Sequence, residues 1–278
     1  MTRLLVVNAD DLGLTAGVCR AVALAHTDGV VTSTSVLAVG RAFDDAAAVL
    51  QDNEELGLGA HLAIVGEDPP LLTAREVPTL VDRSGRFPLS YRTVVARGVA
   101  GRIDPADVAR EFRAQIERVR GIGRPVTHLD THQHTHLWPA VADVVVDLAG
   151  EAGIGAVRLP GSARRGPLGA GVRVLAGRLR QRLASAGVAT TEAYAGLDEA
   201  GRLDARGLDV ALRRAARADV GSLEVNAHPG EAGDPDLARF DWDYRWADET
   251  TMLTDPVTRR LVIAHGFRLG TFADLVAA

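Results

Sequence analysis

Residues 127–136 read THLDTHQHTH, and the rest of the chain can be understood around this stretch. It holds four of the eight histidines, with an aspartate among them. The residues before it, 123–126, indicate a loop that enters a buried strand. In an extended strand, side chains two residues apart point to one face, so His128, Asp130 and His132 could converge if the strand persists that far. Imidazoles beside a carboxylate are the ligands that a zinc, iron, manganese or nickel site requires.

Two adjacent acids follow the first apolar segment of the chain. A strand is predicted over Leu4 to Asn8, Asp10 and Asp11 come directly after it, and a helix is expected over Thr15 to Ala25. In parallel α/β architectures the carboxyl ends of the strands hold the functional groups. Neighbouring side chains point in different directions, which suits one acid to cation binding and the other to proton transfer. The alternative is that one acid caps the helix.

Two further strand ends carry polar side chains. Residues 56–62 form a short apolar strand that contains His61, for which a structural and a functional role are equally expected. Strand parity over residues 222–228 puts Glu224, Asn226 and His228 on one face, and Pro-Gly then turns the chain. His228 is therefore placed to act as a general acid or base, with Glu224 able to pair with it or with Arg158. A turn histidine without function is the alternative.

Strands and helices alternate along nearly the whole chain. Further strands are expected over 30–38, 154–160 and 267–271, and further helices over 42–51, 104–120, 139–149 and 255–265. About seven strands separated by helices indicate a parallel sheet, and functional candidates at many strand ends favour a closed barrel. We expect an α/β fold in one domain spanning residues 1–278, a single distorted (β/α) barrel of the TIM type. Its active site should lie at the C-terminal strand ends.

Three segments stand apart from this alternation. Residues 66–90 indicate a long loop, which in a compact domain is usually a lid or a binding loop. Residues 162–186 are rich in arginine with interleaved leucine and valine, as in a solvated amphipathic helix. Residues 240–246 are rich in aromatic side chains, and Arg245 is spaced to pair with Glu249 on a helix.

The composition excludes several classes of chemistry and partner. The 31 basic residues are all arginine, so Schiff-base catalysis and a P-loop lysine are impossible. A net charge of −5 argues against nucleic acid and anionic membranes as partners. No apolar run is long enough to span a bilayer, and one cysteine, Cys19, excludes an internal disulfide. A cytoplasmic protein is expected; its oligomeric state is not specified, and a homodimer is compatible with the sequence.

The collected side chains favour metal-assisted hydrolysis. An Asp-His-His set can hold a divalent metal and leave positions open for water and substrate. A second carboxylate could then take a proton from water, and a histidine could protonate a leaving amine. No G-x-S-x-G motif is present, which argues against a covalent acyl-enzyme.

Four motifs occur in order along the chain: ADDLG at 9–13, GAHL at 59–62, HLDTHQHTH at 128–136 and HPG at 228–230. They resemble the signature of the YdjC-like carbohydrate deacetylases over about residues 3–272. This resemblance implies a distorted (β/α) barrel and one divalent metal ion, Mg²⁺ or Zn²⁺. It also implies an enzyme that removes an N-acetyl group from a small amino sugar or an N-acetylated oligosaccharide or glycoside. Leu12 departs from the family's usual phenylalanine.

The resemblance also implies roles for individual residues. Asp11, His61 and His128 would bind the metal, Asp10 would be the general base, and His228 the general acid or oxyanion partner. Five further residues would contact the substrate or hold the ligands in place: Asp130, His132, His134, Arg158 and Glu224. Two alternatives remain open, a metal-dependent hydrolase of another bond such as a phosphoester, and a catalytically silent barrel that binds sugar or metal.

Overall fold

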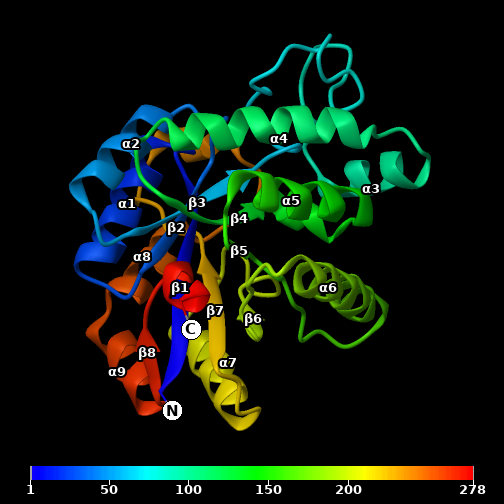
Figure 1. Cartoon of the computed structure of the whole chain (residues 1–278). Helices are drawn as coiled ribbons and strands as arrows, with labels where there is room; N and C mark the ends of the chain where they lie inside the picture. The colour runs from blue at the N-terminus through cyan, green and yellow to red at the C-terminus, as the bar shows by residue number, and fades with distance from the viewer. Residues whose placement is uncertain (1, 278) are drawn as a thin grey trace.

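Parallel strands occupy the centre of the molecule and helices surround them, as the computed structural model of residues 2–277 shows (Figure 1). Seven strands follow one another in the order β5-β4-β3-β2-β1-β7-β6, and β8 pairs with β1 beside this path. Every pair of strands is parallel. The strands are β1 (Arg3–Leu12), β2 (Ser33–Val36), β3 (Gly57–Leu62), β4 (Val126–Thr131), β5 (Ala156–Val157), β6 (Ala193–Ala195), β7 (Ser222–Ala227) and β8 (Phe267–Leu269).

The two ends of this sheet approach each other at a narrow seam. Ala189, just before β6, forms an isolated parallel bridge with Ala156 of β5. The amide of Val157 donates to the carbonyl of Ala189 at 3.0 Å, and the amide of Ala189 donates to the carbonyl of Gly155 at 2.9 Å. The sheet therefore curves into a distorted barrel, which confirms the predicted fold class.

Helices connect the strands and pack on the outer surface of the barrel (Figure 1). Helix α4 begins as the sequence predicts, with the Asp104 side chain accepting from the amide of Ala106 and Pro105 in the first turn. The helices are α1 (Ala16–Thr27), α2 (Phe43–Asp52), α3 (Tyr91–Val99), α4 (Pro105–Arg120), α5 (Pro139–Ala152), α6 (Pro167–Ala186), α7 (Ala205–Arg217), α8 (Trp246–Thr254), α9 (Pro256–Ala264) and α10 (Phe272–Val276), with short 3₁₀ segments η1 (His132–Leu137) and η2 (Pro235–Arg239).

Alternation along β1 separates two kinds of interior. Leu5, Val7 and Ala9 belong to the large apolar core between the strands and the helices. Leu4 and Val6 belong instead to a small apolar cluster with Phe272 of α10. Above that cluster, the same face of β1 carries Asn8 and Asp10, which are buried and polar. The outer core thus holds the fold together, while most of the barrel interior is free to carry polar groups.

Several predicted boundaries are corrected by the structure. Strand β1 continues to Leu12, so Asp10 and Asp11 lie within its last residues rather than after it. Strand β2 covers only Ser33–Val36 of the predicted 30–38; before it, the amides of Val30 and Val31 donate to Leu253 and Ala25 outside the sheet. Residues 66–90 contain neither helix nor strand, as predicted, but helix α3, which follows them, was not anticipated.

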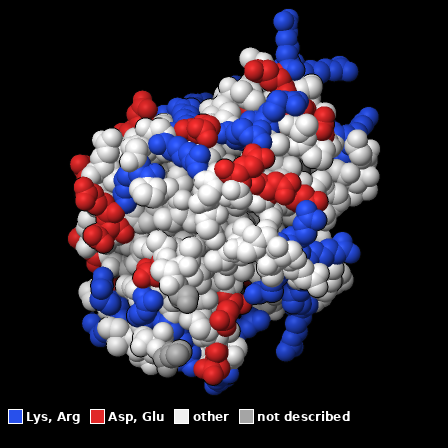
Figure 2. Space-filling view, viewed as in Figure 1, with Lys and Arg blue, Asp and Glu red and all other residues white. Residues whose placement is uncertain are grey.

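The charged surface is mixed. On the face shown in Figure 2, acidic and basic side chains are interspersed around an uncharged centre. Within residues 2–277, no helix combines the length and the apolar character that crossing a membrane requires.

The single cysteine gives a direct test of the packing of α1. Cys19 is 1% exposed, and burial raises the pKa of its thiol to about 12. Because the thiolate is the reactive form, on the order of one thiol in 10⁴ is ionised at pH 8. We expect an aromatic disulfide reagent to label the native protein at least ~100-fold more slowly than the guanidinium-unfolded protein. Prompt labelling of the native protein would contradict this packing, and Cys19→Ser provides the blank.

Candidate metal centre

The end of β1 turns two adjacent acids toward one cavity. Asp11 has a left-handed backbone (φ 64°), and the pairing of β1 with β2 shifts register between Ala9 and Leu12. This irregularity breaks the usual alternation, so Asp10 and Asp11 both line a cavity of about 280 Å³. Neither acid caps α1, because Thr15 is the N-cap and its hydroxyl accepts from the amide of Val18. The capping alternative is thereby excluded.

Asp11, His61 and His132 form a compact cluster of possible ligands. Asp11 Oδ1 lies 3.3 Å from His61 Nε2 and 3.1 Å from His132 Nδ1. The two imidazole nitrogens are 3.2 Å apart, and all three side chains are buried. Oδ1 of Asp11 has no conventional hydrogen-bond donor. One oxygen and two nitrogens aimed at one point are a donor set that suits a divalent cation.

His128 lies apart from this cluster, in contrast to its expected place as a ligand. The β3–β4 register places His128 opposite Gly59 and Asp130 opposite His61, one layer nearer the cavity. The ring of His128 stacks on Phe272 with centroids 3.8 Å apart, and its Nε2 lies 3.1 Å from the Ser35 hydroxyl.

A glycine makes the room for this buried ring. A Cβ on Gly59 would come within 2.2 Å of the His128 imidazole. Burial, only partly opposed by Asp130, lowers the pKa of His128 to about 3, so the ring is neutral at pH 7. His128 is therefore a packed and hydrogen-bonded part of the barrel interior.

His132 reaches the cluster because β4 ends just before it. The strand stops at Thr131, and the chain enters η1, in which Gln133 and His134 have left-handed backbones. The condition that the strand persists through His132 is thus not met. His132 is the first residue after the strand, and from there its ring reaches Asp11.

Asp130 supports the cluster from behind. Its Oδ1 lies 2.7 Å from His61 Nδ1, which leaves His61 Nε2 directed at Asp11. Its Oδ2 accepts from the Ser35 hydroxyl at 2.6 Å. Asp130 is fully buried, which by itself would raise its pKa, but Arg158 and His61 together hold the pKa well below the usual range.

Arg158 links three buried carboxylates across the barrel. It pairs with both oxygens of Asp10 at 2.6 and 2.7 Å, with Asp130 at 2.8 Å and with Glu224 at 2.6 Å. The guanidinium is completely buried, yet its three anionic partners keep its pKa well above the usual value. Arg158 stands immediately after β5, and this position places it at the centre of the network.

Glu224, Asn226 and His228 were predicted to lie on one face of β7, and their contacts agree with this. Glu224 pairs with Arg158 rather than with His228, and Asn226 donates to Asp10. Because one Glu224 oxygen has no partner, burial raises the pKa of this carboxyl to about 7, although Arg158 opposes the shift. His228 follows at the rim of the cavity, with Nε2 4.0 Å from Asp10 Oδ2.

The other histidines of the 128–136 stretch are neutral. His136 is fully buried between the Thr131 hydroxyl and the Arg158 carbonyl, and burial lowers its pKa to about 4. His134 lines the cavity with Nε2 3.3 Å from the Tyr194 hydroxyl, and burial and Arg158 lower its pKa well below the usual value. His136 therefore holds the backbone of Arg158 in place, and His134 faces the cavity.

Sequence reasoning missed two groups around the cavity. Glu249 is fully buried, accepts from the amide of His228 at 2.5 Å and lies 3.9 Å from its Nδ1. It does not pair with Arg245, because its carboxylate turns inward. Trp242 and Tyr244 form one wall, with the Trp242 indole donating to Glu67 at 3.0 Å. The alternation of aromatic and charged residues in 240–246 was the available signal.

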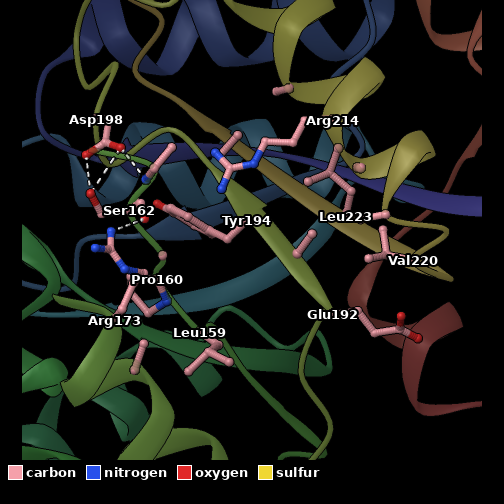
Figure 3. Close-up of a pocket in the computed structure, with 18 of the residues that line it drawn as sticks. Leu159, Pro160, Ser162, Arg173, Glu192, Tyr194, Asp198, Arg214, Val220 and Leu223 are labelled. Atoms are coloured by element: carbon pink, nitrogen blue, oxygen red, sulfur yellow. Dashed lines mark hydrogen bonds between the residues drawn. The ribbon is translucent and has the colours of Figure 1, made fainter. Parts of the chain in front are cut away.

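A larger cavity of about 480 Å³ lies beside this one, over β6 and between α6 and α7 (Figure 3). Tyr194 lines it, and Asp198 accepts from Ser162 at its edge. The Asp11, His61 and His132 cluster does not line it. The smaller cavity, where the acids and imidazoles converge, is therefore the candidate reaction site.

The polar barrel interior, with an Asp-His-His cluster at the C-terminal strand ends, defines an α/β barrel with a candidate metal centre. Comparison with known proteins identifies the family: a family model described as "YdjC-like protein" matches residues 4–264. The chain belongs to this family.

Named relatives agree with this assignment, and a solved structure agrees with the fold. A chitooligosaccharide deacetylase of Klebsiella pneumoniae (strain 342) is 31% identical over 99% of this chain and 100% of its own length. A carbohydrate deacetylase of Brevibacillus brevis is 35% identical, but the match covers 53% of this chain and 56% of that relative. A structure from Enterococcus faecalis V583, provisionally described as a cellobiose-phosphate cleavage protein, superposes with a TM-score of 0.82. It is 23% identical over 99% of both chains, so it supports the fold alone.

Proposed function

We propose that this protein is a metal-dependent hydrolase that removes the N-acetyl group from an amino sugar or an N-acetylated oligosaccharide or glycoside. The observation that carries the proposal is the buried Asp11-His61-His132 cluster beside Asp10 and His228 in one cavity. The full-length similarity to a chitooligosaccharide deacetylase supports the substrate class.

Asp11, His61 and His132 would hold the divalent ion. The negative charge around His61 attracts a positive one: although burial lowers the pKa of its imidazole, Asp130, Asp10 and Asp11 raise it to about 10. A cation bound there would replace that proton. Two nitrogens and one oxygen suit Zn²⁺ better than Mg²⁺, which prefers oxygen ligands. When bound, such an ion lowers the pKa of water and polarises a carbonyl oxygen.

A second group of acids and histidine, Asp10 with His61 and Asp130, could also contact a cation. We do not place the ion there, because Arg158 already pairs with both of those carboxylates at 2.6 to 2.8 Å. A cation at the same point would meet the buried guanidinium. Arg158 therefore separates the roles of the adjacent acids, leaving Asp11 for the metal and Asp10 for the proton.

Asp10 acts as the general base in this proposal. Arg158 fixes the plane of its carboxylate through both oxygens, and Asn8 and Asn226 donate to it as well. These donors hold the carboxylate in one orientation at the cavity, where it accepts a proton from the attacking water as one of the donors moves aside.

His228 supplies the second proton transfer. As the C–N bond of the amide breaks, the imidazole protonates the departing amine nitrogen, and acetate is the other product. Glu249 holds the backbone of His228 through its amide, and Tyr244 packs edge-on against the ring with centroids 4.9 Å apart. These contacts position the acid at the mouth of the cavity.

Asp10→Asn provides the test of the proposed base. The substitution keeps the size of the side chain and should leave metal binding intact, because Asp10 is outside the proposed ligand set. We expect kcat for acetate release from N-acetylglucosamine or chitobiose to fall by ~10²-fold or more. Acetate and bound metal are measured on the same preparations, with and without chelator.

The outcomes separate the alternatives. Normal turnover by Asp10→Asn with full metal content would remove Asp10 from the role of base. Phosphate release from sugar phosphates, with no acetate from any N-acetyl sugar, would favour a phosphoester hydrolase. Failure to retain any divalent cation after reconstitution would favour a silent sugar-binding barrel. A cytoplasmic location stays a prediction from the sequence, which is compatible with a homodimer but does not specify the oligomeric state.

A further inference from the structure

An apolar groove adjoins the cavity that holds Asp11. Its volume is about 430 Å³, and it shares Tyr91, Gln133, His134 and Leu197 with that cavity, so the two spaces are contiguous. Two helices that both contact η1, α3 and α6, form its walls. The wall side chains are Tyr91, Val94 and Val95 from α3, and Leu168, Val172 and Leu175 from α6.

The apolar stripe of α6 is only half covered. Its members repeat every three or four residues, from Leu168 through Val172 and Leu175 to Leu179 and Leu183. Leu179 and Leu183 are fully buried against the core. Leu168, on the same stripe, is 62% exposed and faces the groove. The uncovered half is the half next to the candidate metal centre.

The walls that α3 and α6 contribute are mainly aliphatic, and several of the polar groups beside them are already occupied. Asp198 accepts from the Ser162 hydroxyl and from the amide of Ala163. The carbonyl oxygen of the Gln133 side chain accepts from the amide of Tyr91, and its nitrogen donates to Leu89. A second sugar ring would need free donors and acceptors for its hydroxyls, which aliphatic walls do not offer. A hydrocarbon chain needs none.

We propose that this groove is a second subsite that binds an aliphatic chain carried by the N-acylated sugar. The proposal rests on the function proposed above, and it adds an amphiphilic substrate class to it. The chain could be attached at the anomeric oxygen or within the acyl group. Both present the same hydrocarbon to the groove, and the test distinguishes them.

The experiment compares substrates that differ only in the chain. Amine release is measured for the methyl and hexyl glycosides of N-acetylglucosamine, for methyl N-hexanoylglucosaminide and for chitobiose. We expect kcat/KM for one of the two hexyl-type compounds to exceed that of the methyl N-acetyl glycoside by ~10-fold or more. Preference for the hexyl glycoside places the chain at the anomeric oxygen, and preference for the hexanoyl amide places it in the acyl group.

Two matched variants on α6 assign the effect to the groove. Leu168→Asn should reduce the hexyl-to-methyl ratio by at least ~3-fold, because it puts an amide on the wall. Val174→Asn makes the same change at a valine of the same helix. Val174 is about as exposed as Leu168, but it does not line the groove. That variant should leave the ratio unchanged.

Contrary results fall into separate classes. Equal kcat/KM for hexyl and methyl compounds, or a preference for chitobiose over both hexyl compounds, overturns the groove proposal but leaves the deacetylase proposal standing. If no compound is hydrolysed, the proposed function fails, and calorimetric binding of hexyl against methyl glycoside then decides the groove. An oligomer that Leu168→Asn converts to monomers would show that a second copy of the chain occupies it, and would also overturn the proposal.

Discussion

Replacing Arg158 with methionine should unfold the protein or lower its free energy of unfolding by at least ~3 kcal/mol. The guanidinium is completely buried and pairs with Asp10, Asp130 and Glu224, so the substitution leaves three carboxylates in the interior without their cation. Each must then remain charged without a partner or take up a proton. Urea unfolding followed by circular dichroism measures the loss, and acetate release should disappear with it.

Two further variants show whether the loss comes from unpaired charge. Adding Glu224→Gln to the methionine variant removes one of the orphaned acids and should recover part of the stability. Arg182→Met breaks an exposed ion pair with Asp143 and should cost less than ~1 kcal/mol. If Arg158→Met were as mild as Arg182→Met, the network would not be what holds the barrel interior together.

The second large effect concerns the identity of the third metal ligand. His132→Gln is expected to weaken binding of the divalent ion by at least ~100-fold and to abolish acetate release, because it removes one nitrogen of the proposed set. His128→Gln makes the same change one layer deeper in the barrel. Its ring contacts Ser35 and Phe272 rather than Asp11, so this variant should keep its metal.

Metal content after dialysis, measured on both glutamine variants, decides between the two histidines. Thermal melts of the apoproteins report separately on folding, since His128 is buried and its replacement will lower stability. Retention of metal by His132→Gln together with loss by His128→Gln would restore the ligand set that the family resemblance implied. Loss in both would indicate that the metal centre extends deeper than the cluster around Asp11.

The fold was predictable because its signals are local. Apolar strands that end in polar residues recur along the chain, and each pairs with a parallel neighbour in the structure. Asp10, Asp11, His61 and His228 were found for the same reason: each stands at or next to the end of such a strand. Their convergence on one cavity follows from the parallel direction of the strands.

The choice between His128 and His132 was not predictable, because it depends on two non-local features. The β3–β4 pairing slips between Leu58 and Gly59, which sets the layer in which His128 lies. Strand β4 ends at Thr131, and the left-handed turn at Gln133 and His134 leads the chain away immediately after His132. A left-handed backbone at Gln133 and His134 cannot be predicted from these residue types, since positive φ outside glycine is uncommon.

Two residues around the cavity that do not stand near a strand end, Glu249 and Trp242, could not be assigned their contacts from local sequence patterns. Glu249 lies in α8 and reaches His228 only because that helix packs behind the turn after β7. Trp242 is placed by Glu67, which belongs to the long loop after β3. The alternation in 240–246 marks Trp242 as a candidate, but its contact with Glu67 and that of Glu249 with His228 join segments far apart in sequence, and such contacts leave no local pattern.

The single bridge between Ala156 and Ala189 has a consequence for how relatives can diverge. Elsewhere the barrel wall is a run of paired strands, and an inserted residue would shift the register of a proposed ligand. At this seam only the Ala156–Ala189 bridge joins the two edges, so the lengths of the segments on either side of α6, between Arg158 and Ala189, can drift at little cost. Those segments border the apolar groove and the larger cavity but contribute none of the proposed metal ligands. Substrate range can therefore evolve on one side of the molecule while the reaction is conserved on the other.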